Sequence, residues 1–437
     1  MKNVTTTLLM LFASISFAQS FNSQKLDSLF LLLEKNNKYM GSIAISQNQK
    51  TIYKNAIGFV DVENGIKATT TSKYRIGSIS KMFTASLIFK TIESEKLALD
   101  QTINTFFPNI KNANIITIEN LLNHSSGIHD FTRDENYLQW NTLFQSKEKL
   151  FEHIESGEST FKPNEKSEYS NSNYLLLTFI LEEIHNMPFP EILKTNIVQP
   201  LKLKNTYYGG KTNTEENESY SYKYLKTWEK ESETDMSIPQ GAGAIISNPT
   251  DLNIFVEQLF LGKIVSEKSL KLMETIKNGY GMGLFQFPYN DKISFGHTGS
   301  IDGFQSVTSY FSEDKLAISL TSNGINYTQN NILLAALATY FNEPYKLPTF
   351  NKIELTTEDL DQFLGIYSSE EIPPKITISK KDNILFAQAT GQGAFPLEPT
   401  AQNVFTFDPA GVKIEFIPSE KTLTLYQGGG EFHFKAE

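Results

Sequence analysis

The sequence predicts an α+β protein, in which one antiparallel sheet is flanked by helices and joined to a mainly helical second lobe, with a small all-β domain after it. Two observations predict this class. Alternating apolar and polar runs lie near both ends of the first part of the chain, and apolar-rich helical segments fill the stretch between them. From about Leu355 onward, short alternating runs dominate instead.

The first segment of the chain has the features of an export signal. Lys2 precedes an apolar run, Leu8–Phe17, and small residues up to Ala18 stand ahead of Gln19. Residues 1–18 are therefore predicted to be a signal peptide, and the protein to be periplasmic or secreted. Because this run is too short to span a bilayer and no other segment approaches that length, no transmembrane segment is expected in the mature chain.

The next part of the chain is predicted to form a helix, a hairpin and a second helix. Leu26–Leu33 has apolar residues at helical spacing, and two alternating runs, Gly41–Ser46 and Thr51–Gly58, flank a polar turn. The apolar positions between Ile79 and Glu95 then predict a largely buried helix.

The middle of the chain is predicted to be helical. Thr117 is placed as the N-cap of a short helix that ends before Gly127. Tyr174–Ile184 and Leu252–Leu261 are apolar and helical, the second after an Asn-Pro-Thr-Asp start signal. Lys211–Asp235 is polar and charged, and we expect it to be a surface excursion.

Strands return near the end of this first domain. Phe304–Tyr310 and Lys315–Thr321 flank a polar turn, and an apolar helix, Asn331–Phe341, follows them. Strands at the two ends of the domain with helices between them predict a single antiparallel sheet, whose outer strands come from opposite ends of the chain.

A linker that contains Pro344 and Pro348 divides the first domain, residues 19–345, from the tail, residues 346–437. Short alternating runs punctuated by Gly and Asp predict that the tail is a small β-barrel or sandwich. The runs are KITIS, ILFAQAT, VFTF, VKIEFI and TLTLY.

Composition limits the partners and the chemistry. A formal net charge of −10 over 437 residues, without a clustered basic surface, argues against a nucleic-acid binder. We expect a small-molecule or peptide substrate, and a cell-wall peptide is one candidate. The chain has no cysteine, which excludes disulfides and thiol catalysis. Its 6 histidines have no metal-ligand spacing, so neither a metal ion nor another cofactor is expected.

Ser78 and Lys81 form an S-x-x-K pair at a predicted turn into a helix. Residues three apart on a helix share a face, so the Lys81 amine is expected within reach of the Ser78 hydroxyl. The pair can act as nucleophile and base only if burial lowers the lysine pKa by about three units from its ordinary value of about 10.4. The alternative is an N-cap serine beside a solvated lysine, as we expect for a second such pair, Ser146 and Lys149.

A second motif, Tyr169-Ser-Asn171, stands just before an apolar helix. Residues two apart on an extended chain point to the same side, so the phenol and the amide are expected to face one site. A phenol can pass on a proton when neighbouring cations lower its pKa, and an amide can bind a substrate carbonyl.

A third motif, His297-Thr298-Gly299-Ser300, is expected to open a strand. Its small residues let a substrate backbone approach closely, and a backbone N–H at this edge can pair with that of Ser78 as an oxyanion hole. Taken alone, His297 would be read as a structural histidine.

In this order, the three motifs resemble those of the penicillin-recognising serine enzymes. Over roughly residues 25–342 the chain is identified as a member of the class C β-lactamase and D-alanyl-D-alanine carboxypeptidase superfamily. The stretches IENLLNHSSGIHDF, GAGAIISNPTDL and YGMGL are similar to the same family. The resemblance implies a β-lactamase/transpeptidase-like fold and, for the tail, the small β domain appended to many exported members.

The resemblance also implies roles for the site residues. Ser78 would attack a carbonyl and form an acyl-enzyme, while Lys81 and Tyr169 share the proton transfers and either can be the general base. Asn171 would orient the substrate, and the N–H groups of Ser78 and Ser300 would hold the oxyanion. Residues that would contact the substrate carboxylate or tune the site are His297 and Thr298, with Gly299 in the same motif.

Position 297 departs from β-lactamases of this group, which generally carry lysine there. A neutral imidazole attracts a carboxylate less than an ammonium does, so His297 favours a carboxypeptidase-like peptidase, an amidase or an esterase. Two alternatives stay open, namely a true class C-like β-lactamase and a non-catalytic penicillin-binding or sensor module. A third assigns the tail a carbohydrate- or wall-binding role.

Overall fold

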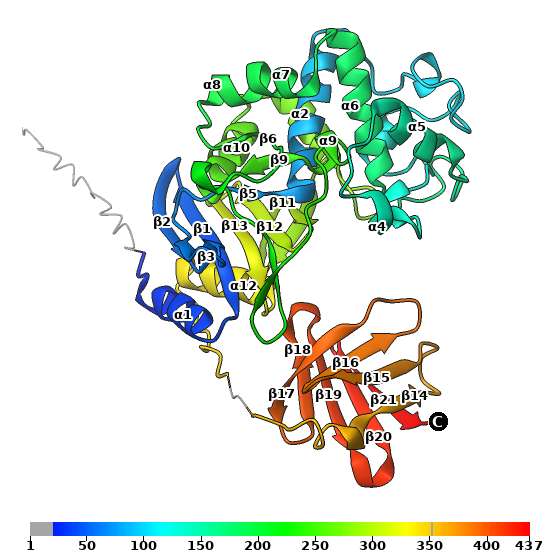
Figure 1. The fold of residues 1–437 in the computed structure, drawn as a ribbon. Coiled ribbons are helices and arrows are strands. Elements are labelled where there is room, and N and C mark those ends of the chain that lie inside the picture. Colours follow the sequence, from blue (N-terminus) through cyan, green and yellow to red (C-terminus); the bar gives the residue numbers. More distant parts are fainter. Residues whose placement is uncertain (1–20, 351–352) are drawn as a thin grey trace, which may run out of the picture.

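The computed structural model describes residues 21–350 and 353–437. The predicted signal peptide, residues 1–18, lies outside the described residues. A sheet with the strand order β10-β11-β12-β13-β1-β2 forms the centre of the first domain (Figure 1). These strands are β1 (Tyr39–Gln47), β2 (Lys50–Ile57), β10 (Phe285–Tyr289), β11 (Lys292–Ile301), β12 (Phe304–Phe311) and β13 (Leu316–Ile325).

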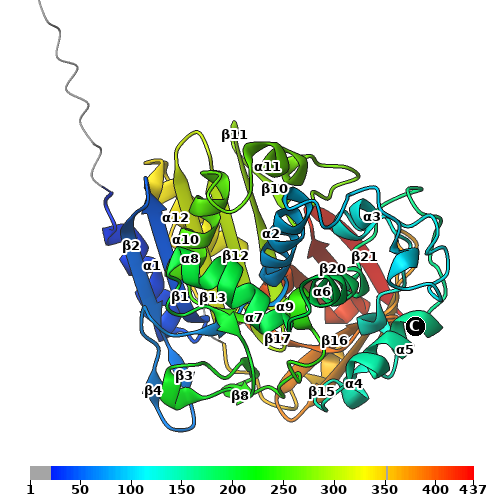
Figure 2. The same cartoon turned by 90° about the horizontal axis from the view of Figure 1, so that it is seen from above.

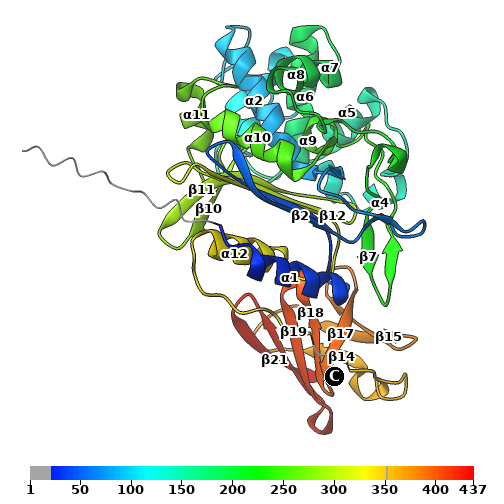
Figure 3. The same ribbon diagram turned by 90° about the vertical axis from the view of Figure 1, so that its left-hand side faces the viewer.

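Helices cover both faces of this sheet. On the face toward the tail lie α1 (Gln24–Lys35) and α12 (Gln329–Tyr340), which share one apolar core with the sheet (Figure 3). The opposite face is covered by α10 (Pro249–Phe260), which contacts β1, β12 and β13. α1 packs on the sheet through four buried apolar residues at helical spacing, Leu26, Leu29, Phe30 and Leu33, whereas Leu31 is 65% exposed.

A helical lobe stands beside the sheet, and α2 (Ser80–Glu93) lies between the two (Figure 2). Phe83 of α2 stacks on Phe255 of α10 with ring centroids 3.7 Å apart, and α2 contacts α6 on its other side. The lobe contains α3 (Ile118–Leu122), α4 (Tyr137–Trp140), α5 (Lys147–Ser156) and α6 (Asn171–His185). The predicted α+β class with a helical lobe is therefore confirmed.

Shorter elements complete the first domain. The helices are α7 (Phe189–Leu193), α8 (Gln199–Leu201), α9 (Gln240–Gly243) and α11 (Glu267–Glu274). The strands are β3 (Phe59–Asp61), β4 (Ile66–Lys67), β5 (Tyr74–Arg75), β6 (Tyr207–Tyr208), β7 (Tyr222–Tyr224), β8 (Trp228–Lys230) and β9 (Ile245–Ser247). In the described residues no helix combines the length and the apolar character needed to cross a membrane.

Local sequence signals placed many of these elements correctly. The predicted hairpin is β1 and β2, and Thr117 caps α3, since its side chain accepts from the Asn120 N–H at 3.2 Å. The expectation that His297 opens a strand was wrong, because β11 begins at Lys292 and the motif lies at its end. The sequence analysis also missed β10, an edge strand whose alternation is interrupted by Pro288.

The segment Lys211–Asp235 is more than the predicted surface excursion. Its β7 strand joins the main sheet, where Tyr222 pairs with Gly324 of β13. Tyr222 and Thr234 are buried, although polar neighbours in the sequence are exposed. Composition alone could not reveal this, because the buried positions are separated by charged ones that face solvent.

The tail is a closed eight-stranded barrel, which decides between the predicted barrel and sandwich. Its strands are β14 (Gly365–Ser368), β15 (Ile376–Lys381), β16 (Ile384–Ala389), β17 (Phe395–Ala401), β18 (Val404–Phe407), β19 (Val412–Ile417), β20 (Thr422–Gln427) and β21 (Gly430–Ala436). The five predicted runs are strands. Among those missed, β17 carries Pro396 and Pro399, and its register shifts after Pro399, so its sequence lacks a clean alternation.

The barrel is attached to the first domain by a buried cation. The Lys38 side chain is 4% exposed, and its amine pairs with Glu398 and, at 3.3 Å, with Asp408 of the barrel. Asn326, which follows β13, also donates to Glu398 at 3.4 Å. Two carboxylates of the barrel therefore neutralise a lysine that the first domain buries beside its own sheet.

Candidate active site

Ser78 and Lys81 come together where the chain enters α2. Ser78 lies in a single 3-10 turn, η1 (Gly77–Ile79), and Lys81 in the first turn of α2. Ser78 is half-buried and lines a cleft of about 620 Å³, whereas Lys81 is fully buried. The Lys81 Nζ lies 3.0 Å from the Ser78 Oγ, so the hydroxyl faces both the amine and the cleft.

The Lys81 amine has two further oxygen partners. Nζ lies 2.8 Å from the Asn171 Oδ1 and 2.8 Å from the backbone oxygen of Ala242 in α9. The pKa of Lys81 is lowered to about 7, because burial lowers it by more than the nearby Asp130 carboxylate raises it. At neutral pH a large fraction of this amine is therefore unprotonated, which an exposed lysine cannot achieve.

Two glycines let β11 approach the turn that carries Ser78. A Cβ on Gly299 would lie 2.0 Å from the Ile76 oxygen, and one on Gly77 would lie 2.8 Å from the Ser300 nitrogen. Gly77 also has a left-handed backbone, with φ of +51°. β10 pairs with β11 only as far as Gly296, so beyond that point β11 contacts η1. Ser300, which is exposed, lines the cleft together with Ser78.

Tyr169 lies just before α6, with its ring beside Lys81. Its ring centroid is 4.9 Å from the Lys81 Nζ. Burial raises the pKa of Tyr169, the Ser78 hydroxyl lowers it and the Asp130 carboxylate raises it again. The phenol therefore keeps its proton at neutral pH. The ring is supported by His124, whose centroid is 4.5 Å away and whose Nδ1 accepts from the Ser170 N–H at 3.2 Å.

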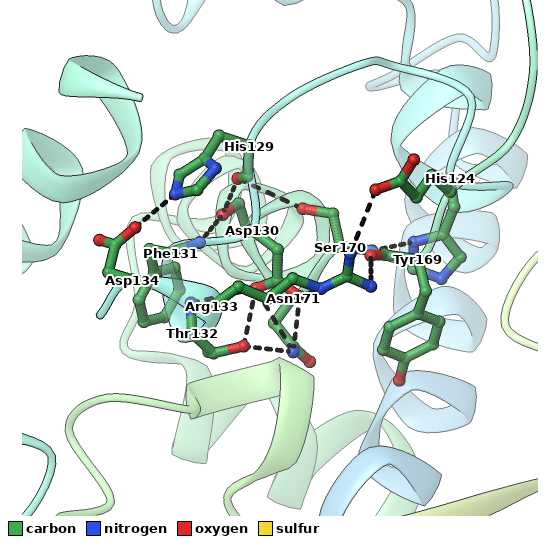
Figure 4. A network of polar contacts seen from close by, with 12 residues as sticks. His124, His129, Asp130, Phe131, Thr132, Arg133, Asp134, Tyr169, Ser170 and Asn171 are labelled. Atoms are coloured by element: carbon green, nitrogen blue, oxygen red, sulfur yellow. Dashed lines mark hydrogen bonds and ion pairs between the residues drawn. The ribbon is translucent and has the colours of Figure 1, made fainter. Parts of the chain in front are cut away.

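Asn171, the first residue of α6, is held by a polar network (Figure 4). Its Nδ2 donates to the Asp130 Oδ2 at 3.2 Å and to the Thr132 Oγ1 at 3.1 Å. Its Oδ1 accepts from Lys81 on the opposite side. The amide is thus polarised, with its donor toward the carboxylate and its acceptor toward the amine.

The β11 motif divides between the two faces of the strand. His297 and Gly299 are buried, while Thr298 and Ser300 are exposed. Burial, together with the Lys81 charge, lowers the pKa of His297 to about 3, so the imidazole is neutral at neutral pH. Its Nδ1–H donates to the Thr298 oxygen, and its ring packs 4.4 Å from that of Phe285.

The second S-x-x-K pair has an ordinary surface setting. The Ser146 Oγ caps α5 by accepting from the Lys149 N–H at 3.3 Å. The Lys149 amine is exposed and pairs with Glu152 at 2.8 Å.

Three residues of the site were not predicted from the sequence, namely Asp130, Thr132 and His124. All three belong to the loop after α3, and two of them lie in the quoted stretch IENLLNHSSGIHDF. The signal for His124 and Asp130 was the stretch itself, which was matched to the family without roles being assigned to these two residues. Residues 21–350 and 353–437 contain no group of three His, Asp or Glu side chains able to hold a metal ion.

Comparison with protein families decides the affiliation. The family model described as Beta-lactamase matches residues 34–339, which is most of the chain. The chain belongs to the β-lactamase family. This β-lactamase-family protein is accordingly a serine hydrolase, and each of its three motifs contributes one residue to the lining of the cleft, namely Ser78, Asn171 and Ser300.

Individual relatives are more distant. Penicillin-binding protein 4* of Bacillus subtilis is 25% identical, over 93% of this chain and 97% of that protein. Teichoic acid D-alanine hydrolase of Staphylococcus aureus is 25% identical, over 65% of this chain and 70% of that protein. A penicillin-binding protein homologue from Pyrococcus abyssi, described as octameric, has the same fold, with a TM-score of 0.66 at 23% identity over 95% of this chain and 100% of that one. D-amino acid amidase from Ochrobactrum anthropi matches with a TM-score of 0.65 at 23% identity, over 73% of this chain and 99% of that one.

Proposed function

We propose that this protein is an exported serine hydrolase that forms an acyl-enzyme at Ser78 on D-aminoacyl substrates, as an amidase or esterase in preference to a carboxypeptidase-like peptidase, which needs a substrate with a free carboxylate. One observation carries the proposal. The buried Lys81 amine, with its pKa lowered to about 7, lies 3.0 Å from the Oγ of a serine that opens onto a cleft. Acyl transfer requires a base that contacts the nucleophile and whose pKa lies near the working pH.

The hydrogen-bond partners of Lys81 support its proposed role as the general base. Neutral lysine has two N–H bonds and one lone pair. The Asn171 Oδ1 and the Ala242 oxygen can only accept, so they take both N–H bonds and leave the lone pair facing Ser78. The Ser78 proton then passes to Nζ as Oγ bonds to the substrate carbonyl carbon. Tyr169 is protonated at neutral pH, which makes it the less suitable base.

The remaining groups fit the later steps. The N–H groups of Ser78 and Ser300 would stabilise the oxyanion, and their close approach depends on Gly77 and Gly299. Tyr169 would give its proton to the leaving group as the carbonyl reforms, and the Lys81 ammonium would return a proton to the phenolate. In deacylation, water would lose its proton to Lys81 and release the acid, and the proton would return to Ser78.

The charges of the cleft favour a neutral or cationic substrate over one with a free carboxylate. His297 is neutral, so it supplies no cation beside the nucleophile. Among the described side chains that line the cleft, four are carboxyls and Arg133 is the one cation, which itself pairs with Glu168 at 3.1 Å. The carboxyls are Asp134, Glu135, Glu231 and Asp302, of which Asp302 pairs with the buried Arg75 at 3.1 Å and Glu231 with Lys223 at 3.6 Å. The relative whose name specifies D-alanine hydrolysis from teichoic acid supports an aminoacyl substrate with a free ammonium.

A matched substrate panel tests this proposal. We expect D-alanyl-D-alanine peptides that end in an amide, D-amino acid amides and D-alanyl esters to have kcat/KM values roughly tenfold or more above that of the same peptide with a free carboxylate. A chromogenic cephalosporin represents the β-lactamase alternative, and Ser78→Ala provides the blank. A panel in which the carboxylate peptide or the cephalosporin is turned over fastest would contradict the substrate assignment, and acylation without turnover would favour a sensor.

Export is proposed from the N-terminal segment. Lys2 and the apolar run Leu8–Phe17 end in small residues before Gln19. N-terminal sequencing of the protein recovered from its native cells is expected to start at Gln19. Recovery of a chain that still begins at Met1 from the cytoplasmic fraction would exclude this part of the proposal.

A further inference from the structure

We propose that Asp130 is a positioning residue, whose buried carboxylate fixes the amide orientation of Asn171 and thereby aims the Lys81 amine at Ser78. The inference rests on the proposed roles of Ser78 and Lys81. Asp130 is 6% exposed and precedes a short turn, η3 (Phe131–Arg133), in the loop after α3. It touches neither Ser78 nor Lys81 by a hydrogen bond, so its influence passes through Asn171 (Figure 4).

The hydrogen bonds around Asp130 leave one orientation for the Asn171 amide. The Asp130 Oδ1 accepts from the Thr132 N–H at 3.2 Å and from its hydroxyl at 2.9 Å. Because the hydroxyl proton is used there, the Thr132 Oγ1 can only accept from the Asn171 Nδ2. A flipped amide would place its oxygen against the carboxylate and its NH₂ against the lysine. The carboxylate therefore dictates that Oδ1 faces Lys81.

Asp130 also supplies negative charge to a pocket whose other ionisable groups are neutral. The titratable groups that face Lys81 from the packed elements are His124, Tyr169, Tyr174 and His297. Burial lowers the pKa of both histidines and raises that of both tyrosines, which leaves them all uncharged near neutral pH. Arg133 approaches Asp130 only at 3.9 Å and is 56% exposed. The Asp130 carboxylate is thus the main negative charge near a protonated Lys81.

Asp130→Asn is a near-isosteric substitution that reverses this polarity. The fixed N–H of Thr132 would hold the new side-chain oxygen, so the new NH₂ would face the Asn171 Nδ2. Two donors repel, and Asn171 would turn its oxygen toward the new amide and its NH₂ toward Lys81. The lysine lone pair would then accept from Asn171 instead of Ser78. Loss of the carboxylate also favours neutral Lys81, so its pKa should fall.

The test measures the labelling rate of Ser78 by an uncharged fluorophosphonate between pH 5 and 9. In this reaction the Oγ–P bond forms, fluoride leaves and the hydroxyl proton passes to Lys81. For the wild type, we expect a rate that rises with pH through a midpoint of about 7, because the neutral amine is the active form. For Asp130→Asn, we expect the midpoint to move down by roughly one pH unit and the plateau rate to fall on the order of 10²-fold.

Two results would overturn the inference, namely wild-type kinetics or a lower plateau with an unchanged midpoint, which marks a merely structural role. Asp251→Asn is the matched control, since Asp251 is also buried but accepts from Asn205 and Thr206, and its midpoint should stay near that of the wild type. If Asp130→Asn does not fold, the same labelling measurement on Thr132→Val tests the inference. A several-fold lower plateau supports the inference, and an unchanged plateau overturns it. An unlabelled wild type would instead refute the proposed function.

Discussion

Ser78→Ala is expected to lower kcat/KM by on the order of 10⁴-fold or more and to abolish the covalent adduct with a fluorophosphonate. The substitution removes the atom that bonds to the substrate, while the oxyanion N–H groups and the cleft remain. Folding should be little affected, because Ser78 is half-buried and its hydroxyl meets a lysine that keeps two other acceptors. Intact-mass spectrometry and steady-state kinetics measure both effects.

Ser146→Ala is the matched control, because the chain offers the same spacing in an inert setting. This variant should hydrolyse and label like the wild type. Its stability should fall by about 1 kcal/mol, because the hydroxyl caps α5. An adduct that persists in Ser78→Ala and disappears in Ser146→Ala would show that the wrong pair has been assigned.

Gly299→Ala is expected to lower kcat/KM by roughly 10²- to 10³-fold in a protein that still folds. The new methyl group would lie 2.0 Å from the Ile76 oxygen and 2.6 Å from the Ser306 Oγ, so β11 must move away from η1. That movement carries the Ser300 N–H away from Ser78 and should weaken the proposed oxyanion hole. Steady-state kinetics on the preferred substrate would measure the loss of kcat/KM, and circular dichroism would show whether the variant is folded.

The control for this substitution is Gly393→Ala in the barrel. Gly393 has no heavy atom within 4 Å of an added Cβ, so activity and stability should stay near those of the wild type. If the steric explanation is correct, Gly299→Ala lowers kcat/KM and Gly393→Ala does not. A folded Gly299→Ala protein with the wild-type kcat would mean that the backbone of β11 does not contribute to catalysis.

Much of the fold could be predicted because its signals are local. Helix α6 contains the apolar run Tyr174–Leu181, which only Thr178 interrupts, and Asn248 caps α10 by accepting from the Asp251 N–H at 2.9 Å. The missed strands β10 and β17 carry prolines and depend on neighbours that come from elsewhere in the chain. The pairing of strands from distant parts of the chain is a long-range property. The burial of Tyr222 could therefore not be predicted from the polar residues around it in the sequence.

The candidate site likewise combines local contacts, which could be predicted, with long-range contacts, which could not. Ser78 and Lys81 are three residues apart, so helix geometry alone predicted their contact. Asp130 makes its decisive contact with Asn171, and neither residue type nor spacing indicates which carboxylate will lie beneath a given amide. His124 likewise supports Tyr169 from a separate loop. Such contacts are fixed by tertiary packing, which a single sequence does not display.

The order of strands in the sheet has a consequence for the time at which the enzyme can begin to work. β1 lies between β2 and β13, and it pairs with β13 from Tyr39 opposite Ile325 to Gln47 opposite Leu316. As the chain emerges from the ribosome, the early hairpin therefore exposes an unpaired edge until β13 arrives. A nascent chain that ends at Ser300 already carries all three motifs. It still lacks β12 and β13, the two strands that connect β11 to β1, so catalytic competence comes late in synthesis.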